Sequence, residues 1–143
     1  MTGLTASALR VQQPPVGVAP DCEFTISVDH PHRLVRATLI GFFTPAEVER
    51  FAREEQAAVE TLDCPKGEHR VLIDASQCQV HTREVAEAFA RLASDPPIKA
   101  RRIAVVANGT LHRIQTRRIL DADRSAMFDT LADAERWILA DAG

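Results

Sequence analysis

The chain has 143 residues, of which 45% are hydrophobic and 26% charged, and its formal net charge is -3. This length and composition predict one globular domain, and the small negative charge gives no indication of nucleic-acid binding. The three cysteines form no C-x-x-C pair, and no apolar run is long enough for a signal peptide or a membrane span. We therefore expect a cytoplasmic protein without structural disulfides.

The first part of the chain predicts a tail followed by a hairpin. Residues 1–22 have no strand or helix period and contain a Pro-Pro pair, so we expect a flexible N-terminal tail. The single domain is then expected over residues 23–143. Two short apolar runs, 24–28 and 34–40, are joined by a turn and predict two antiparallel strands.

A long amphipathic helix is predicted next. Thr44 is suited to cap the first turn, Pro45 fits a position that needs no amide donor, and Glu47 completes a capping-box pattern. Apolar residues then recur at helical spacing over about 17 residues, until Cys64 and Gly67 close the helix. The residues predicted to face inward are Val48, Phe51, Ala52, Val59 and Leu62.

Short buried strands then alternate with amphipathic helices. The strands are predicted at 70–74, 102–107 and 126–128, and the helices begin near Thr82, Leu111 and Thr130. In the last helix, Leu131, Ala134 and Ile138 are expected to face inward. The order β-β-α-β-α-β-α-β-α predicts an α/β domain with a mixed, mostly parallel sheet of about five strands, a hairpin at its start and about four helices.

This arrangement resembles the SpoIIAA-like (STAS) domains related to anti-sigma-factor antagonists, over residues 23–140. The resemblance rests on the hairpin before a long helix, on the strand 71–74 with its following loop and helix, and on the strand 103–106 with the ending 128–137. It implies the STAS fold and a non-catalytic interaction or regulatory module. Phosphorylatable antagonists carry an Asp-Ser-Ser-Gly type turn before the second helix. Residues 80–84 contain no serine or glycine there, and Thr82 is interpreted as an N-cap.

Candidate binding residues follow the carboxyl ends of the strands, where open α/β sheets place ligands. They are Asp74, Ser76, His81, Thr82, Asn108, Gly109, Thr110, Arg113 and Arg117. Asp74 either caps its own loop or forms an acid–base pair with His81. Gly109 either allows a tight turn with positive φ or opens an anion site at the helix start.

Basic residues gather between Lys99 and Arg124, where seven Lys or Arg stand against two Asp. Arg113 and Arg117 share a helix face, so an acidic partner, a phosphate or a lipid head group is one hypothesis and a solvated face is the other. Nucleic acid is not expected, because no aromatic residues interleave with the arginines and the chain has no tyrosine.

No metal site or cofactor is predicted. Cys64, His69, Cys78 and His81 do not have the spacing of a zinc site, and a buried strand separates the first pair from the second. The leading hypothesis is a STAS-like module that binds a protein partner or a small anionic or apolar ligand.

Two further hypotheses about function remain open, and so does the oligomeric state. The fold is similar to the carboxyl-terminal part of the CRAL-TRIO lipid-binding fold, so a small-molecule or lipid carrier with a pocket behind the first helix is the first alternative. An enzyme that uses Asp74 and His81 is the second. A homodimer is a further hypothesis, with Phe42 and Phe43 as one candidate contact.

Overall fold

The computed structural model describes residues 22–95, 99–120 and 123–140. Its elements are β1 (Cys22–Asp29), β2 (Leu34–Gly41), α1 (Pro45–Glu60), β3 (Arg70–Cys78), α2 (Arg83–Ser94), β4 (Arg102–Val106), α3 (Thr110–Ile119), β5 (Ser125–Phe128) and α4 (Leu131–Ala140). The predicted fold class and element order are confirmed. The predicted tail lies outside the described residues, apart from Cys22, which begins β1.

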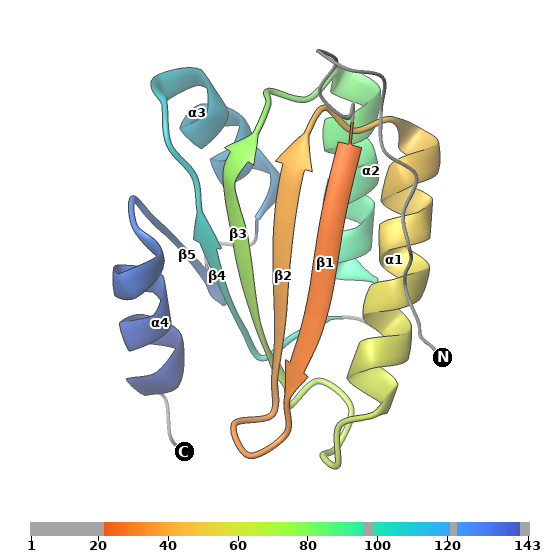
Figure 1. Ribbon diagram of the computed structural model, residues 1–143, viewed down its shortest axis with the longest axis vertical. Helices are drawn as coiled ribbons and strands as arrows, with labels where there is room; N and C mark the ends of the chain where they lie inside the picture. The colour runs from red at the N-terminus through yellow and green to blue at the C-terminus, as the bar shows by residue number, and fades with distance from the viewer. Residues whose placement is uncertain (1–21, 96–98, 121–122, 141–143) are drawn as a thin grey trace, which may run out of the picture.

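The strands form one sheet in the order β1-β2-β3-β4-β5 (Figure 1). β1 and β2 are antiparallel, and the later neighbours are parallel. Consecutive strands are therefore neighbours throughout, and each parallel pair is joined through a helix. The carboxyl ends of β2, β3 and β4 lie at the same edge of the sheet, as the sequence pattern predicts.

The helices cover the two faces of the sheet unequally. α1 and α2 lie side by side on one face (Figure 1), where Phe43, Phe51 and Phe89 belong to the larger buried cluster. α4 packs on the other face, where Ala134 and Ile138 bury against β3 and β4. The sheet is thus the middle layer of three, and α1 and α2 cover most of the apolar core.

Threonines cap three of the helices as predicted. The hydroxyl oxygens of Thr44, Thr82 and Thr130 accept hydrogen bonds from amides three residues later, at 3.2–3.3 Å. One orientation in the last helix is wrong, because Leu131 stands at the first turn of α4 and is 41% exposed. None of the described helices combines the length and the apolar character that a membrane span requires.

A bulge changes the facing of β3 near its end. Thr38 of β2 pairs with Asp74, but Ile40 pairs with Gln77, so β3 holds one extra residue between these two pairs. Strict alternation from Ile73 would turn Gln77 inward and Cys78 outward. The bulge reverses this, since Gln77 is exposed and Cys78 is buried under the helices.

Candidate functional site

The loops that follow β2 and β3 meet at the carboxyl edge of the sheet, and α3 packs against the second of them. The Gln79 amide donates to the Gly41 carbonyl at 2.8 Å, which joins the two loops. The Gln115 side chain of α3 accepts from the His81 amide and donates to the His81 carbonyl, both at 2.8 Å. The backbone around His81 therefore has a fixed position between the sheet and α3.

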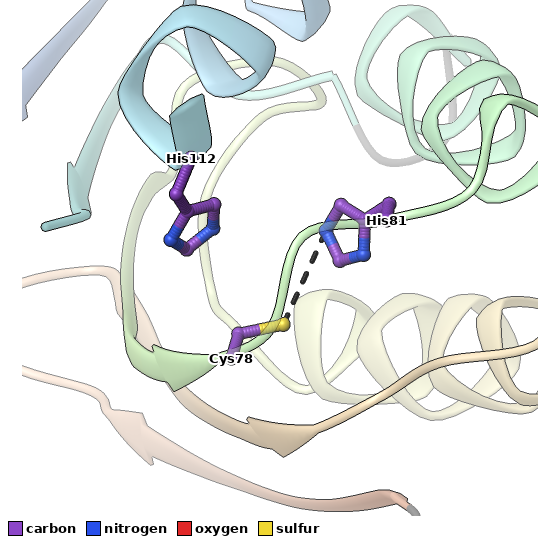
Figure 2. Close-up of side chains that lie close together, drawn as sticks. All are labelled: Cys78, His81 and His112. Atoms are coloured by element: carbon purple, nitrogen blue, oxygen red, sulfur yellow. Dashed lines mark hydrogen bonds between the residues drawn. The ribbon is translucent and has the colours of Figure 1, made fainter. Parts of the chain in front are cut away.

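Three side chains converge behind this edge (Figure 2). Cys78 comes from the end of β3, His81 from the following loop and His112 from the first turns of α3. The Cys78 sulfur lies 4.0 Å from Nε2 of His81, and one sulfur or nitrogen atom from each of the three residues lies within 4.8 Å of the others. Cys78 and His112 are buried, and His81 is partly buried.

Burial keeps all three groups uncharged. Desolvation, reinforced by the nearby His112, lowers the pKa of His81 to about 4. Desolvation also lowers the pKa of His112, although a hydrogen bond to the Asn108 backbone acts in the opposite direction. Burial raises the pKa of the Cys78 thiol to about 12. At neutral pH the cluster therefore consists of two neutral imidazoles and a thiol.

The His81 ring is held by aromatic neighbours. Its centroid lies 4.8 Å from that of Phe89 and 6.4 Å from that of Phe43, and the His112 ring is 6.1 Å away. Its Nδ1 atom is buried without a hydrogen-bond partner among the described residues. A buried polar atom without a partner is costly, which marks this ring as a candidate ligand-binding group.

An apolar cavity of about 80 Å³ lies beside the cluster, between the sheet and α1, α2 and α3. Its polar lining groups are Glu55, His81, His112 and Thr116. Glu55 is only 5% exposed, and burial raises the pKa of its carboxyl group to about 7. The cavity thus joins an apolar wall to a few convergent polar groups, a composition typical of small-ligand sites.

Asp74 and Ser76 lie apart from this cluster. Asp74 pairs in register with Val106, which belongs to the core on the α4 face, whereas His81 packs on the opposite face. Oδ1 of Asp74 accepts from the amide and the hydroxyl of Ser76, at 3.1 and 2.7 Å. The structure therefore does not bring Asp74 and His81 together as an acid–base pair.

The loop between β4 and α3 is a structured turn. Gly109 has φ +83°, as expected for a tight turn at this position. The Asn108 side chain donates to the Asp129 carbonyl at 2.8 Å, and the Arg113 guanidinium forms an ion pair with the Asp129 carboxylate. Thr110, the first residue of α3, is exposed. Asn108 and Arg113 thus fasten this loop to the start of α4.

Large apolar side chains are exposed along the carboxyl edge. Phe42 follows β2, Val80 follows β3, and Leu111 and Ile114 lie on α3. Their exposed fractions are 40%, 38%, 63% and 40%. Arg117 and Arg118 are exposed in the last turn of the same helix. We call these four apolar residues the edge patch.

Sequence reasoning did not predict that Cys78 and His112 lie beside His81. A signal existed for His112, because His112, Thr116 and Ile119 recur at i, i+4 and i+7, which predicts one buried helix face. No such signal exists for Cys78, because its inward orientation depends on the bulge in β3. Cys64 precedes β3 and Cys78 ends it, so these two cysteines belong to opposite ends of the strand.

Comparison with known proteins identifies the fold. No protein-family model and no curated protein matches the chain. An uncharacterised Shewanella loihica protein of the DUF3478 family, with a SpoIIAA-like fold, superposes with a TM-score of 0.64 at 17% identity, over 85% of this chain and 98% of that one. An anti-sigma factor antagonist from Mycobacterium paratuberculosis superposes with a TM-score of 0.53 at 19% identity, over 84% and 97%. The domain therefore has the SpoIIAA-like (STAS) fold.

Proposed function

We propose that this domain is a non-catalytic regulatory module that binds a protein partner through the edge patch. The observation that carries the proposal is the exposure of four large apolar side chains at one edge of the sheet. The sharing of a fold with an anti-sigma factor antagonist supports the same class of function. Exposed apolar side chains that gather on one surface favour a partner-binding role.

Local geometry supports a single surface. Gly41 pairs with Cys78 in the sheet, which brings the loop of Phe42 beside the loop of Val80. Leu111 lies one helical turn before Gln115, the residue that holds the loop of Val80 against α3. Ile114 is three residues from Leu111 on the same helix. The edge patch therefore spans two loops and α3.

The surrounding charge indicates the chemistry of the partner. A groove of about 370 Å³ between α2 and α3 is lined by Arg83, Gln115 and Arg118 among others. The exposed Arg83 side chain forms an ion pair with Glu87, which also lines the groove, so the net positive charge there comes from Arg118, four residues after Ile114. We infer that the partner presents apolar side chains next to Asp or Glu, because such a surface complements both the patch and the groove.

A site-specific crosslink tests this proposal. A photoreactive amino acid is placed at Leu111 in the source cells, and the same amino acid at Leu131 of α4 gives a matched control at an exposed leucine on the other face. We expect a protein adduct at position 111 that is absent at position 131. The identified partner is then purified and its affinity for the chain is measured.

Variants decide whether the adduct reports binding. Leu111→Asp and Arg118→Glu should each weaken the purified complex, Leu111→Asp by at least ~10-fold, since an anchor residue at an interface contributes about 2 kcal/mol or more and about 1.4 kcal/mol is already tenfold. Leu131→Asp should leave the affinity unchanged. An adduct that joins two copies of this chain would show that the edge patch is the interface of a homodimer and not the site of a different protein. Unchanged affinity in Leu111→Asp would contradict the proposal.

A small-molecule carrier is the second candidate function, and the apolar cavity favours it. At about 80 Å³ the cavity is smaller than one of ~150 Å³ that holds benzene, and drug-sized ligands need ~300 Å³ or more. A lipid tail would therefore require α1, α2 and α3 to separate. Native mass spectrometry of freshly purified protein distinguishes the two, since a carrier retains a bound mass and an empty interaction module does not.

A further inference from the structure

We propose that Cys78, His81 and His112 form a binding site for a transition-metal ion of borderline softness, with Zn²⁺ as its representative. This site goes beyond the proposed partner binding and does not depend on it. It rests on the convergence of three ligand side chains from three separate parts of the fold, shown in Figure 2.

The distances are close to those of a bound ion. Tetrahedral Zn²⁺ with bonds of about 2.3 Å to sulfur and about 2.0 Å to nitrogen places its ligand atoms roughly 3.3–3.6 Å apart. The sulfur of Cys78 and Nε2 of His81 are 4.0 Å apart, and the whole set lies within 4.8 Å. Closure by roughly 0.5 Å between Cys78 and His81, and by up to roughly 1.5 Å at the widest pair, would bring the ligands into range, which side-chain rotation can supply.

The backbone of each ligand is held by an independent feature. The bulge in β3 turns Cys78 inward, and the reciprocal bonds from Gln115 fix the backbone of His81. His112 lies on the buried face of α3. Such positioning reduces the conformational entropy that binding has to overcome.

The protonation states of the two histidines suit a metal better than they suit an anion. Two imidazoles with lowered pKa values are neutral at pH 7, and neutral imidazole is the form that coordinates metals. No described hydrogen bond competes for Nδ1 of His81, so the ring proton can move to that atom when Nε2 binds the ion. Coordination by Cys78 replaces its S–H bond with a metal–sulfur bond and releases the proton to solvent.

The ligand set also selects the class of metal. A thiolate and two imidazoles favour Zn²⁺ and its softer neighbours over Mg²⁺ and Ca²⁺, which prefer oxygen ligands. Three protein ligands leave the fourth tetrahedral position open. The two histidines also line the apolar cavity, so the fourth position is available to water or to a small ligand that enters the cavity.

Titration of the dialysed, reduced full chain with ZnCl₂ tests the site. We expect one Zn²⁺ per chain, and a Co²⁺-loaded sample should show a thiolate-to-metal charge-transfer absorption. Cys78→Ser should abolish that absorption. Cys78→Ser and His112→Gln should each weaken Zn²⁺ binding by ~100-fold or more, since even changes outside the ligand shell cost 10–100-fold. MgCl₂ should give no binding.

Matched variants separate this site from adventitious binding. Cys64→Ser removes a cysteine at the other end of β3, and His32→Ala removes the exposed histidine that pairs with Asp29. Both should keep the affinity and the absorption of the unmodified chain. Circular dichroism shows whether each variant is folded. The charge-transfer band is measured on the unmodified chain, so this readout does not depend on the folding of any variant.

Two results would overturn the metal site. One is the absence of stoichiometric Zn²⁺ binding and of the charge-transfer band in the unmodified chain. The other is a folded Cys78→Ser or His112→Gln variant that binds Zn²⁺ as tightly as the unmodified chain. Loss of binding in His32→Ala alone would assign the ion to the hairpin turn and also reject the site.

Discussion

Replacing Glu55 by Gln should stabilise the domain at alkaline pH. Glu55 lies on the inner face of α1, one turn after Phe51, and it is 5% exposed. Burial raises the pKa of its carboxyl group from 4.5 to about 7. Between these two pH values the folded state keeps a proton that the unfolded chain releases. The unfolding free energy of the domain therefore falls as pH rises through that window.

The size of the effect follows from the pKa difference. Between pH 5 and pH 8 the shift corresponds to a loss of roughly 2–3 kcal/mol of unfolding free energy. A neutral amide has nearly the same shape and does not ionise. The difference in unfolding free energy between Glu55→Gln and the unmodified chain should therefore grow by roughly 2–3 kcal/mol from pH 5 to pH 8.

Urea unfolding of both proteins at several pH values measures this difference. The variant comparison is needed because His81 contributes a slope of the opposite sign. Its folded-state pKa lies below the ordinary value of 6.5, so stability from His81 is lost as pH falls from 6.5 toward 4. Glu54→Gln is the matched control, since the neighbouring carboxylate is exposed. A Glu55→Gln difference that does not change with pH would refute the reasoning.

Three further substitutions test individual features of the fold, each by urea unfolding. Phe43→Ala should lower the unfolding free energy by about 3–5 kcal/mol because the ring is fully buried, whereas Phe42→Ala, at 40% exposure, should lower it clearly less. Equal losses would contradict the burial of Phe43 and the exposure of Phe42. Thr82→Ala should cost about 1 kcal/mol through loss of the α2 cap, and Thr82→Asp should retain most of the stability because Asp also caps; an equal loss in both would exclude the cap. Gly109→Ala should cost about 1–3 kcal/mol, since φ +83° and ψ 141° strain any side chain although no atom lies within 4 Å of the added carbon; no loss would contradict the turn.

Local signals in the sequence were sufficient to predict the element order. Thr44 and Thr82 both accept the predicted capping bonds. The hairpin signal between residues 24 and 40 predicted the antiparallel start of the sheet. These features depend on residues three or four positions apart, or on a short turn, so they need no knowledge of tertiary structure. The homodimer and the N-terminal tail stay predictions.

The site was harder to predict, because it depends on contacts between distant segments. Cys78 faces inward only because β3 gains a residue opposite Leu39, which shifts the alternation of the strand. Arg113 was predicted on a shared basic face with Arg117, but its guanidinium pairs with Asp129, sixteen residues later. Asp74 and His81 are only seven residues apart in the chain, yet the sheet separates them.

Three of the buried polar residues, all on helices, have one property in common that sequence patterns can detect. Glu55, His112 and Thr116 each occupy a position where helical spacing calls for an apolar side chain. A polar group at such a position loses its hydration, which a hydrogen bond to the Asn108 backbone offsets in part for His112. All three line the same cavity, together with His81. A stable core would be simpler to build with apolar residues at these positions, so their gathering in one place favours a binding role for the cavity over a purely structural one.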